Sequence, residues 1–177
     1  AIGLGRVGLA AILGAVAAGA GSSVAVDTLK SQLEVAKSFG ATHCFNATDP
    51  DIESKVREVT SGGVDAALEF AGSGRALELA YRITRRGGVT ITAGLPNPKD
   101  IFQIPAVSLV AEERQIKGSY LGSGVPSRDI PRFLGLYSRG KLPVDKLMTH
   151  RIKLDEINEG FDRLHDGSAI RQIIDFD

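Results

Sequence analysis

In the first half of the chain, hydrophobic and polar residues follow two different patterns, and stretches typical of strands alternate with stretches typical of helices. Short apolar runs, typical of buried strands, lie at 24–26, 43–46, 64–70 and 88–92. Between them, apolar residues recur every three or four positions, which predicts helices that begin near 7, 29, 50 and 76. Strands that alternate with helices favour an α/β fold with a doubly wound parallel sheet.

Several local features refine these elements. Asp49 followed by Pro50 predicts a helix start, with Asp as the N-cap and Pro in the first turn. The segment 85–88, Arg-Arg-Gly-Gly, predicts a turn before the strand at 88–92. The residues expected to face the core of the first three helices are Val7, Ala11, Gly14 and Ala18; Leu29, Leu33 and Ala36; and Ile52, Val56 and Val59.

The second half continues the alternation after a proline-punctuated connection at 96–105. The pattern predicts a strand at 115–119, a helix at 127–139, extended chain at 148–153, a helix at 155–166 and a strand at 171–176. Repeats, low-complexity tracts and a dividing linker are all lacking in the sequence. We therefore expect residues 1–177 to form a single domain.

Charge and cysteine content limit the classes of protein to which this chain can belong. Lys plus Arg and Asp plus Glu each number 21, so the chain has no basic field for nucleic acid and no signal for an anionic membrane. The longest apolar run, 7–21, is too short and too rich in glycine to span a bilayer. As a secretory signal it is disfavoured by the strand and acid that follow it. Cys44 is the one cysteine, which fits a reducing compartment and a cytoplasmic protein.

The glycines near the start form the spacing Gly-x-Gly-x-x-Gly. We expect Gly3 to permit a tight turn, Gly5 to let a pyrophosphate approach the backbone, and Gly8 to let the helix pack closely on the strand. The N-terminus of the helix that follows offers unpaired N–H groups to phosphates. Asp27 ends the next strand, where an acid accepts hydrogen bonds from the adenosine ribose. A carboxylate there repels a 2′-phosphate, so NAD is favoured over NADP, although Lys30 is close in sequence.

Longer motifs extend this interpretation. GLGRVGLAA, VAVD, LEVAKSFGATH, GGVDAALEFAG and GGVTITAG, with the ending KLMTHRIKLDEINEGFDRLHDGSAIRQIIDF, resemble the cofactor domain of zinc-type alcohol dehydrogenases in the medium-chain dehydrogenase/reductase family. The resemblance runs from Gly3 to Phe176. It implies an NAD(P)-binding Rossmann fold in an oxidoreductase that transfers a hydride between an alcohol or aldehyde substrate and NAD.

The resemblance also implies roles for individual residues. Arg6 and Val7 would give backbone N–H groups to the pyrophosphate, and Val7 would back the nicotinamide. Arg171 would lie near the pyrophosphate. The residues implied to line the cofactor cleft and the nicotinamide pocket are Phe70, Ala71, Ala93, Gly94, Leu95, Ser119 and Leu121.

The chain also departs from the family pattern. In the family, a zinc- and substrate-binding half and most of the first strand precede the glycine turn, so we expect a truncated first strand and an N-terminal domain outside this chain. We predict no catalytic and no metal-binding residues here, since His43 and Cys44 are adjacent and His150 and His165 stand alone. Zinc is expected in the preceding half, and this chain alone is expected to be inactive.

The family resemblance further implies a homodimer or homotetramer. The apolar, proline-flanked stretch 100–104 is the candidate edge strand for that association. Two other functions stay open: an S-adenosylmethionine-dependent methyltransferase, which also pairs a glycine turn with an acid but adds an antiparallel hairpin near its C-terminus, and a non-catalytic NAD-binding module.

Overall fold

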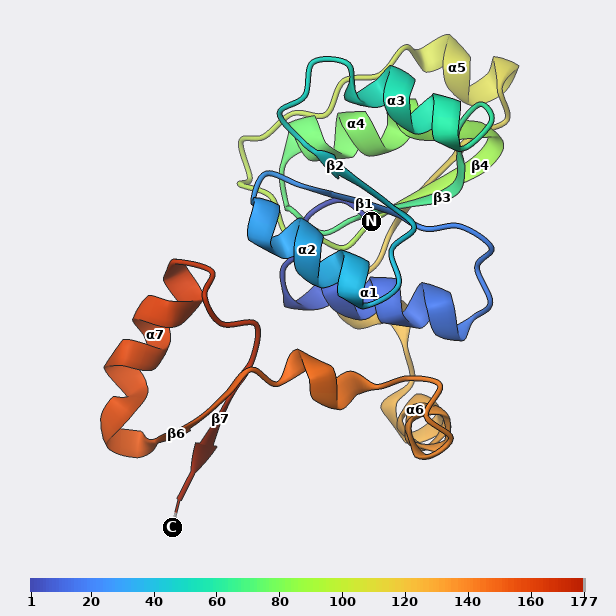
Figure 1. The fold of residues 1–177 in the computed structure, drawn as a ribbon. Coiled ribbons are helices and arrows are strands. Elements are labelled where there is room, and N and C mark those ends of the chain that lie inside the picture. The colour runs from blue at the N-terminus through green and yellow to red at the C-terminus, as the bar shows by residue number, and fades with distance from the viewer. Residues whose placement is uncertain (177) are drawn as a thin grey trace.

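The fold, a computed structural model that describes residues 1–176, is built from alternating helices and strands (Figure 1). The α-helices are α1 (Arg6–Ala17), α2 (Lys30–Ser38), α3 (Ile52–Val59), α4 (Gly74–Ile83), α5 (Ala106–Ala111), α6 (Pro126–Ser138) and α7 (Ile157–His165). The strands are β1 (Val24–Asp27), β2 (His43–Asn46), β3 (Val64–Glu69), β4 (Thr84–Thr92), β5 (Gln115–Gly118), β6 (His150–Lys153) and β7 (Gln172–Asp175). Short 3-10 turns are η1 (Leu121–Ser123), η2 (Val144–Leu147) and η3 (Leu154–Glu156).

The main sheet is parallel and is joined at its centre by one residue. β1 pairs with β2, and β3, β4 and β5 pair in that order, all in parallel. Ile2 bridges Val26 of β1 on one side and Glu69 of β3 on the other. The spatial order is therefore β2, β1, Ile2, β3, β4, β5, and the expected truncated first strand is confirmed as this single bridging residue.

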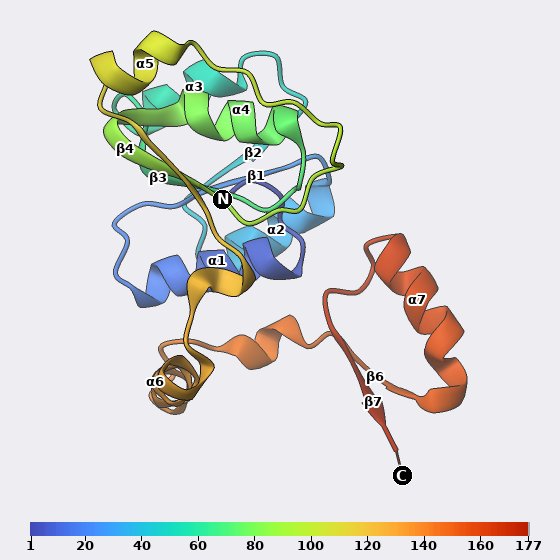
Figure 2. The same ribbon diagram turned by 180° about the vertical axis from the view of Figure 1, so that it is seen from behind.

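Helices cover both faces of the sheet, as the doubly wound prediction requires (Figures 1 and 2). One apolar cluster packs α1 and α2 against the sheet around Leu9, Ile12 and Ala36. The other packs α3 and α4 on the opposite face around Val56 and Ala80. Because a parallel sheet is covered on both faces, its strands carry apolar residues on both sides.

The C-terminal strands do not extend the main sheet. β6 and β7 pair in parallel as a separate two-stranded sheet. Together with α7 they form a lobe that stands beside the main sheet and its helices (Figure 1). We call residues 148–176 the C-terminal lobe. The lobe is anchored to the rest of the fold, since Leu147, just before it, and Ile170, within it, belong to the buried cluster that also contains Leu9 and Ile12 of α1.

The predicted core faces of the first three helices are each partly wrong. The core face of α1 is made by Gly8, Leu9, Ile12 and Leu13, whereas Val7 and Ala18 are exposed. Apolar residues occupy nearly every position of α1, so the sequence period could not select the face. Outside that helix, Leu29 and Val59 are also exposed rather than buried.

The segment 85–88 is not a turn. It belongs to β4, which begins at Thr84 and pairs with β3 through an irregularity in register near Val64. The left-handed backbone of Gly87, with φ of +67°, accommodates the irregularity. The buried hydroxyl of Thr84 donates to Ala80 O at 2.7 Å, which joins the start of β4 to the end of α4.

Helix α3 starts slightly later than predicted. It begins at Ile52 with Asp51 as its N-cap residue, and Asp49 instead accepts a hydrogen bond from Asp51 N at 2.9 Å. The predicted edge strand at 100–104 is also wrong, because this segment has irregular backbone in the structure. Proline at 96, 98 and 105 removes backbone donors along this segment, which opposes strand pairing within the chain.

Candidate cofactor-binding site

The carboxyl ends of the parallel strands meet at one edge of the sheet. Asp27 ends β1, Glu69 ends β3, Thr92 ends β4 and Gly118 ends β5. Ile2 lies where the chain order reverses, with β1 and β2 to one side and β3 to β5 to the other. In open α/β sheets, ligands bind outside the carboxyl ends at such a switch point. The glycine turn begins one residue after Ile2 and therefore lies at this point.

Backbone geometry explains two of the three glycines. Gly3 has φ of +81°, and a Cβ there would lie 2.5 Å from Ala71 N. A Cβ on Gly8 would lie 1.9 Å from Gly3 O, so α1 packs directly on the turn. Gly5 is the N-cap of α1, has open space around its Cβ position and receives no side-chain cap. The N–H groups of the first turn of α1 consequently have no intrahelical partner and stay available to an external acceptor.

Asp27 joins the second strand to the glycine turn. One carboxylate oxygen accepts from Leu4 N at 2.6 Å, and the other accepts from Leu29 N at 2.9 Å. An ionised carboxylate has about four acceptor sites, so each oxygen can still accept a hydroxyl proton. Asp27 is thus held rigidly with free acceptor capacity toward the cleft.

Two cavities flank Asp27. The first, of about 540 Å³, lies toward α3 and α4 and is lined by Gly3, Thr28, Pro50 and Ala71 among others. The second, of about 300 Å³, is lined by Gly5 and Arg6 of the glycine turn and by Gly167 and Ile170 of the C-terminal lobe. The site therefore lies partly between the main sheet and the lobe.

Gln32 of α2 lines the second cavity and is a site residue that the sequence prediction missed. Its side chain is 9% exposed, and its Nε2 donates to Gly167 O at 3.4 Å. Its buried Oε1 has no hydrogen-bond partner among the described residues. A buried acceptor without a partner is costly, so this atom marks a place for a donor from a ligand. A glutamine at an inward position of an amphipathic helix was the available signal.

The residues predicted to lie on the nicotinamide side follow the carboxyl ends of three strands. Phe70 and Ala71 follow β3, Ala93 to Leu95 follow β4, and Ser119 and Leu121 follow β5. Ala71, Ala93, Leu95 and Leu121 are exposed at this edge, while Phe70, Gly94 and Ser119 are half-buried. The structure thus brings all these predicted residues into one neighbourhood.

Glu69, which the sequence analysis does not assign to the cofactor site, is 1% exposed. Its Oε1 accepts from Gly72 N at 2.6 Å, and its Oε2 accepts from the Thr92 hydroxyl at 2.7 Å. A carboxylate directly after the apolar run 66–68 was the sequence signal. The structure joins it to Gly72 and Thr92, in the segment after β3 and at the end of β4.

The predicted basic residue Arg171 is less central than the glycine turn. It is exposed and follows Ile170, the last residue in the lining of the smaller cavity. Its carbonyl accepts from Thr149 N at 2.9 Å, which holds the backbone there. Arg6 and Val7 are also exposed, in the first turn of α1.

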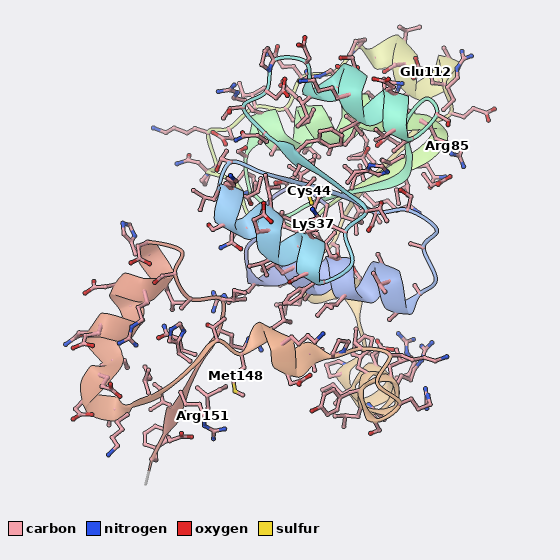
Figure 3. The ribbon with its side chains drawn as sticks, in the orientation of Figure 1. Lys37, Cys44, Arg85, Glu112, Met148 and Arg151 are labelled. Atoms are coloured by element: carbon pink, nitrogen blue, oxygen red, sulfur yellow. The ribbon has the colours of Figure 1, made fainter. Side chains whose placement is uncertain are left out.

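Metal ligation fits this chain poorly. Within residues 1–176, no group of three His, Cys, Asp or Glu side chains is placed to hold a metal ion. Cys44 lies beside α2 near Lys37 (Figure 3), and its thiol donates to Leu33 O at 3.5 Å. Burial raises the pKa of that thiol, which opposes the thiolate that a metal requires. Zinc therefore has no site among the described residues.

Comparison with known proteins decides the family. Residues 7–139 match the family model described as zinc-binding dehydrogenase. The chain belongs to the zinc-binding dehydrogenase family. It is 38% identical over 175 residues to alcohol dehydrogenase 1 of Trifolium repens, an alignment that covers 97% of this chain and 46% of the relative. This confirms the resemblance drawn from the motifs.

Solved structures of zinc-binding dehydrogenases confirm the fold. Benzyl alcohol dehydrogenase from Acinetobacter calcoaceticus aligns with a TM-score of 0.92 and 36% identity, over 97% of this chain and 47% of that one. An alcohol dehydrogenase zinc-binding domain protein from Burkholderia ambifaria aligns with a TM-score of 0.92 and 32% identity, over 98% and 46%. The chain thus spans about half the length of the relatives it matches and has their Rossmann-like architecture.

Two further predictions bear on function class. Every strand pair within residues 1–176 is parallel, so the antiparallel hairpin expected for a methyltransferase is not found there. Nothing in the comparisons supports the methyltransferase alternative. No helix in the described part of the chain is long and apolar enough to cross a membrane.

Proposed function

We propose that residues 1–177 form the NAD-binding domain of a zinc-dependent alcohol dehydrogenase. The observation that carries the proposal is the pairing of the glycine turn with Asp27 at the switch point of the sheet. In this arrangement the uncapped N-terminus of α1 binds a pyrophosphate, and the Asp27 carboxylate accepts from the adenosine ribose hydroxyls. Relatives of this chain are named as alcohol dehydrogenases, which supports hydride transfer between an alcohol and NAD as the reaction.

NAD accepts or supplies the hydride when bound, and the residues of this chain bind and orient it. Gly3, Gly5 and Gly8 shape the turn, and the N–H groups of Arg6 and Val7 face the pyrophosphate, with Arg171 as the nearby positive charge. The nicotinamide lies against Phe70, Ala71, Ala93, Gly94, Leu95, Ser119 and Leu121. Gln32 adds an acceptor for a ribose hydroxyl in the cavity beside Asp27.

We propose that zinc and the alcohol or aldehyde are bound by the rest of the enzyme. The relatives are about twice as long as the aligned region, and the described residues offer no metal site. A zinc ion acts in such reactions as a Lewis acid on the alcohol oxygen. The role of this chain is then to hold the cofactor at a defined place beside that centre.

A titration of the 177-residue chain with NADH and, separately, with S-adenosylmethionine tests the proposal. We expect binding of NADH and no binding of S-adenosylmethionine. With zinc and NAD added, we expect no oxidation of primary or secondary alcohols by this chain alone, since it lacks ligands that position and polarise the substrate. Binding of S-adenosylmethionine without NADH, or turnover above a heat-treated control, would overturn the assignment.

We also propose that the enzyme is a cytoplasmic homodimer or homotetramer. Support for association comes from α5 and the segment before it, where the apolar side chains of Ile101, Val107 and Val110 are exposed. Contiguous exposed apolar side chains are typical of association surfaces. A strictly monomeric species in sedimentation at high concentration would contradict this part of the proposal.

A further inference from the structure

Glu69 is a carboxylate buried in an unusual place. Its backbone pairs with Thr92 in β4 on one side and with Ile2 on the other, and its side chain is 1% exposed. Burial of a charged side chain costs free energy unless hydrogen bonds compensate for it, and an apolar residue would fill the same space without this cost. The partners of the carboxylate therefore indicate what it is for.

Both oxygens bind the ends of strands that border the cleft. Oε1 accepts from Gly72 N at 2.6 Å, in the segment after β3. Oε2 accepts from the hydroxyl of Thr92 at 2.7 Å, at the end of β4. The carboxylate consequently fixes the segment after β3 relative to the end of β4.

Backbone hydrogen bonds extend this connection to the neighbouring segments. The carbonyl of Glu69 accepts from Ala93 N at 2.9 Å and from Gly94 N at 3.1 Å. The carbonyl of Thr92 accepts from Ser119 N at 2.8 Å, in the segment after β5. Segments after three different strands thus converge on Glu69 and its partner.

These segments also pack against each other without side chains between them. A Cβ on Gly94 would lie 2.3 Å from Gly72 N and 2.9 Å from the Oε2 of Glu69. A Cβ on Gly72 would lie 2.9 Å from Leu95 O. At such distances one segment cannot shift unless the other shifts with it, so a change at Glu69 is transmitted to both.

We infer that Glu69 is a positioning residue for the nicotinamide end of the cofactor. It touches no cofactor atom in this assignment; it holds the segments at 70–72, 93–95 and 119–121 in register. The inference rests on the proposed NAD site. The adenosine end is held separately, because the carboxylate of Asp27 is bound by Leu4 N and Leu29 N, neither of which contacts the Glu69 side chain.

This separation provides a test with two ligands. ADP-ribose has the adenosine, pyrophosphate and second ribose of NADH but no nicotinamide. The 177-residue chain and the variants Glu69→Leu, Glu69→Gln and Thr92→Val are titrated with both ligands, and the fluorescence of bound NADH is recorded. Circular dichroism and thermal unfolding establish that each variant is folded.

We expect Glu69→Leu to weaken NADH binding about tenfold and ADP-ribose binding less than twofold, because a buried Gly72 N–H loses its acceptor. Glu69→Gln retains an oxygen acceptor and should restore NADH binding to within about threefold of the wild type. Thr92→Val removes one contact and should lower NADH affinity alone, by a smaller factor. If Glu69→Leu does not fold, the NADH and ADP-ribose affinities of Glu69→Gln and Thr92→Val test the inference.

Four results overturn the inference or the site on which it rests. Equal weakening of both ligands would show that Glu69 supports the whole domain rather than the nicotinamide end. Unchanged NADH affinity in Glu69→Leu and Thr92→Val would show that the segments keep their positions without it. A wild-type chain that binds neither ligand would overturn the proposed NAD site itself. Binding of ADP-ribose and NADH with equal affinity would overturn only the claim that the segments at 70–72, 93–95 and 119–121 bind the nicotinamide.

Discussion

Gly8 of α1 lies directly on Gly3 of the preceding turn, so closely that a Cβ on Gly8 would stand 1.9 Å from the carbonyl oxygen of Gly3. This contact sets the position of the helix relative to the centre of the sheet. It also aims the uncapped first turn of α1 at the edge where Asp27 and Glu69 end their strands. The proposed cofactor site therefore depends on a close contact between two backbones at which no side chain fits.

Replacement of Gly8 by alanine should destabilise the fold. The added methyl group overlaps a backbone atom that cannot rotate away, and we expect a loss of about 3 kcal/mol in the free energy of unfolding. Gly14→Ala in the same helix is the matched control, because its Cβ position has open space and alanine is favoured by about 0.5 to 1 kcal/mol in a helix. Urea unfolding measures both, and equal stability of the two variants would refute the packing role of Gly8.

Asp27→Asn should lower NADH affinity and reduce discrimination against NADPH. The variant loses the charge that repels a 2′-phosphate and one of the acceptors for ribose hydroxyls, so we expect about tenfold weaker NADH binding. We also expect the ratio of NADPH to NADH affinity to rise by about tenfold. Glu34→Gln, an exposed change of the same kind on α2, is the control. An unchanged ratio in Asp27→Asn would count against the ribose assignment.

Gln32→Leu separates cofactor binding from stability. The variant removes the unpartnered Oε1, so the free energy of unfolding without cofactor should change by less than about 1 kcal/mol. NADH affinity should fall by about fivefold, since the cavity loses its acceptor. Isothermal titration and thermal unfolding, with Ser31→Ala as a neighbouring control, measure the two effects. NADH affinity equal to that of the wild type would show that Oε1 meets no cofactor atom.

The sequence alone determined the order of strands and helices in the first half, the glycine turn, the place of Asp27 and the family. These features are local, because glycine spacing and apolar periods act on neighbouring residues through backbone sterics and hydrogen bonding. The predicted site residues converge for the same reason, as the carboxyl ends of parallel strands share one edge.

Only the tertiary structure decided which polar side chains are buried and which groups they form hydrogen bonds with. Glu69 and Gln32 become site residues through Gly72 and Thr92 in one case and Gly167 in the other, partners that the sequence does not identify. The separate C-terminal lobe could not be predicted from the sequence either. The apolar pattern of β6 and β7 is the same whether these strands join the main sheet or form a two-stranded sheet of their own. Burial depends on which distant segments pack together, and a single chain's periodicity carries no information on that choice.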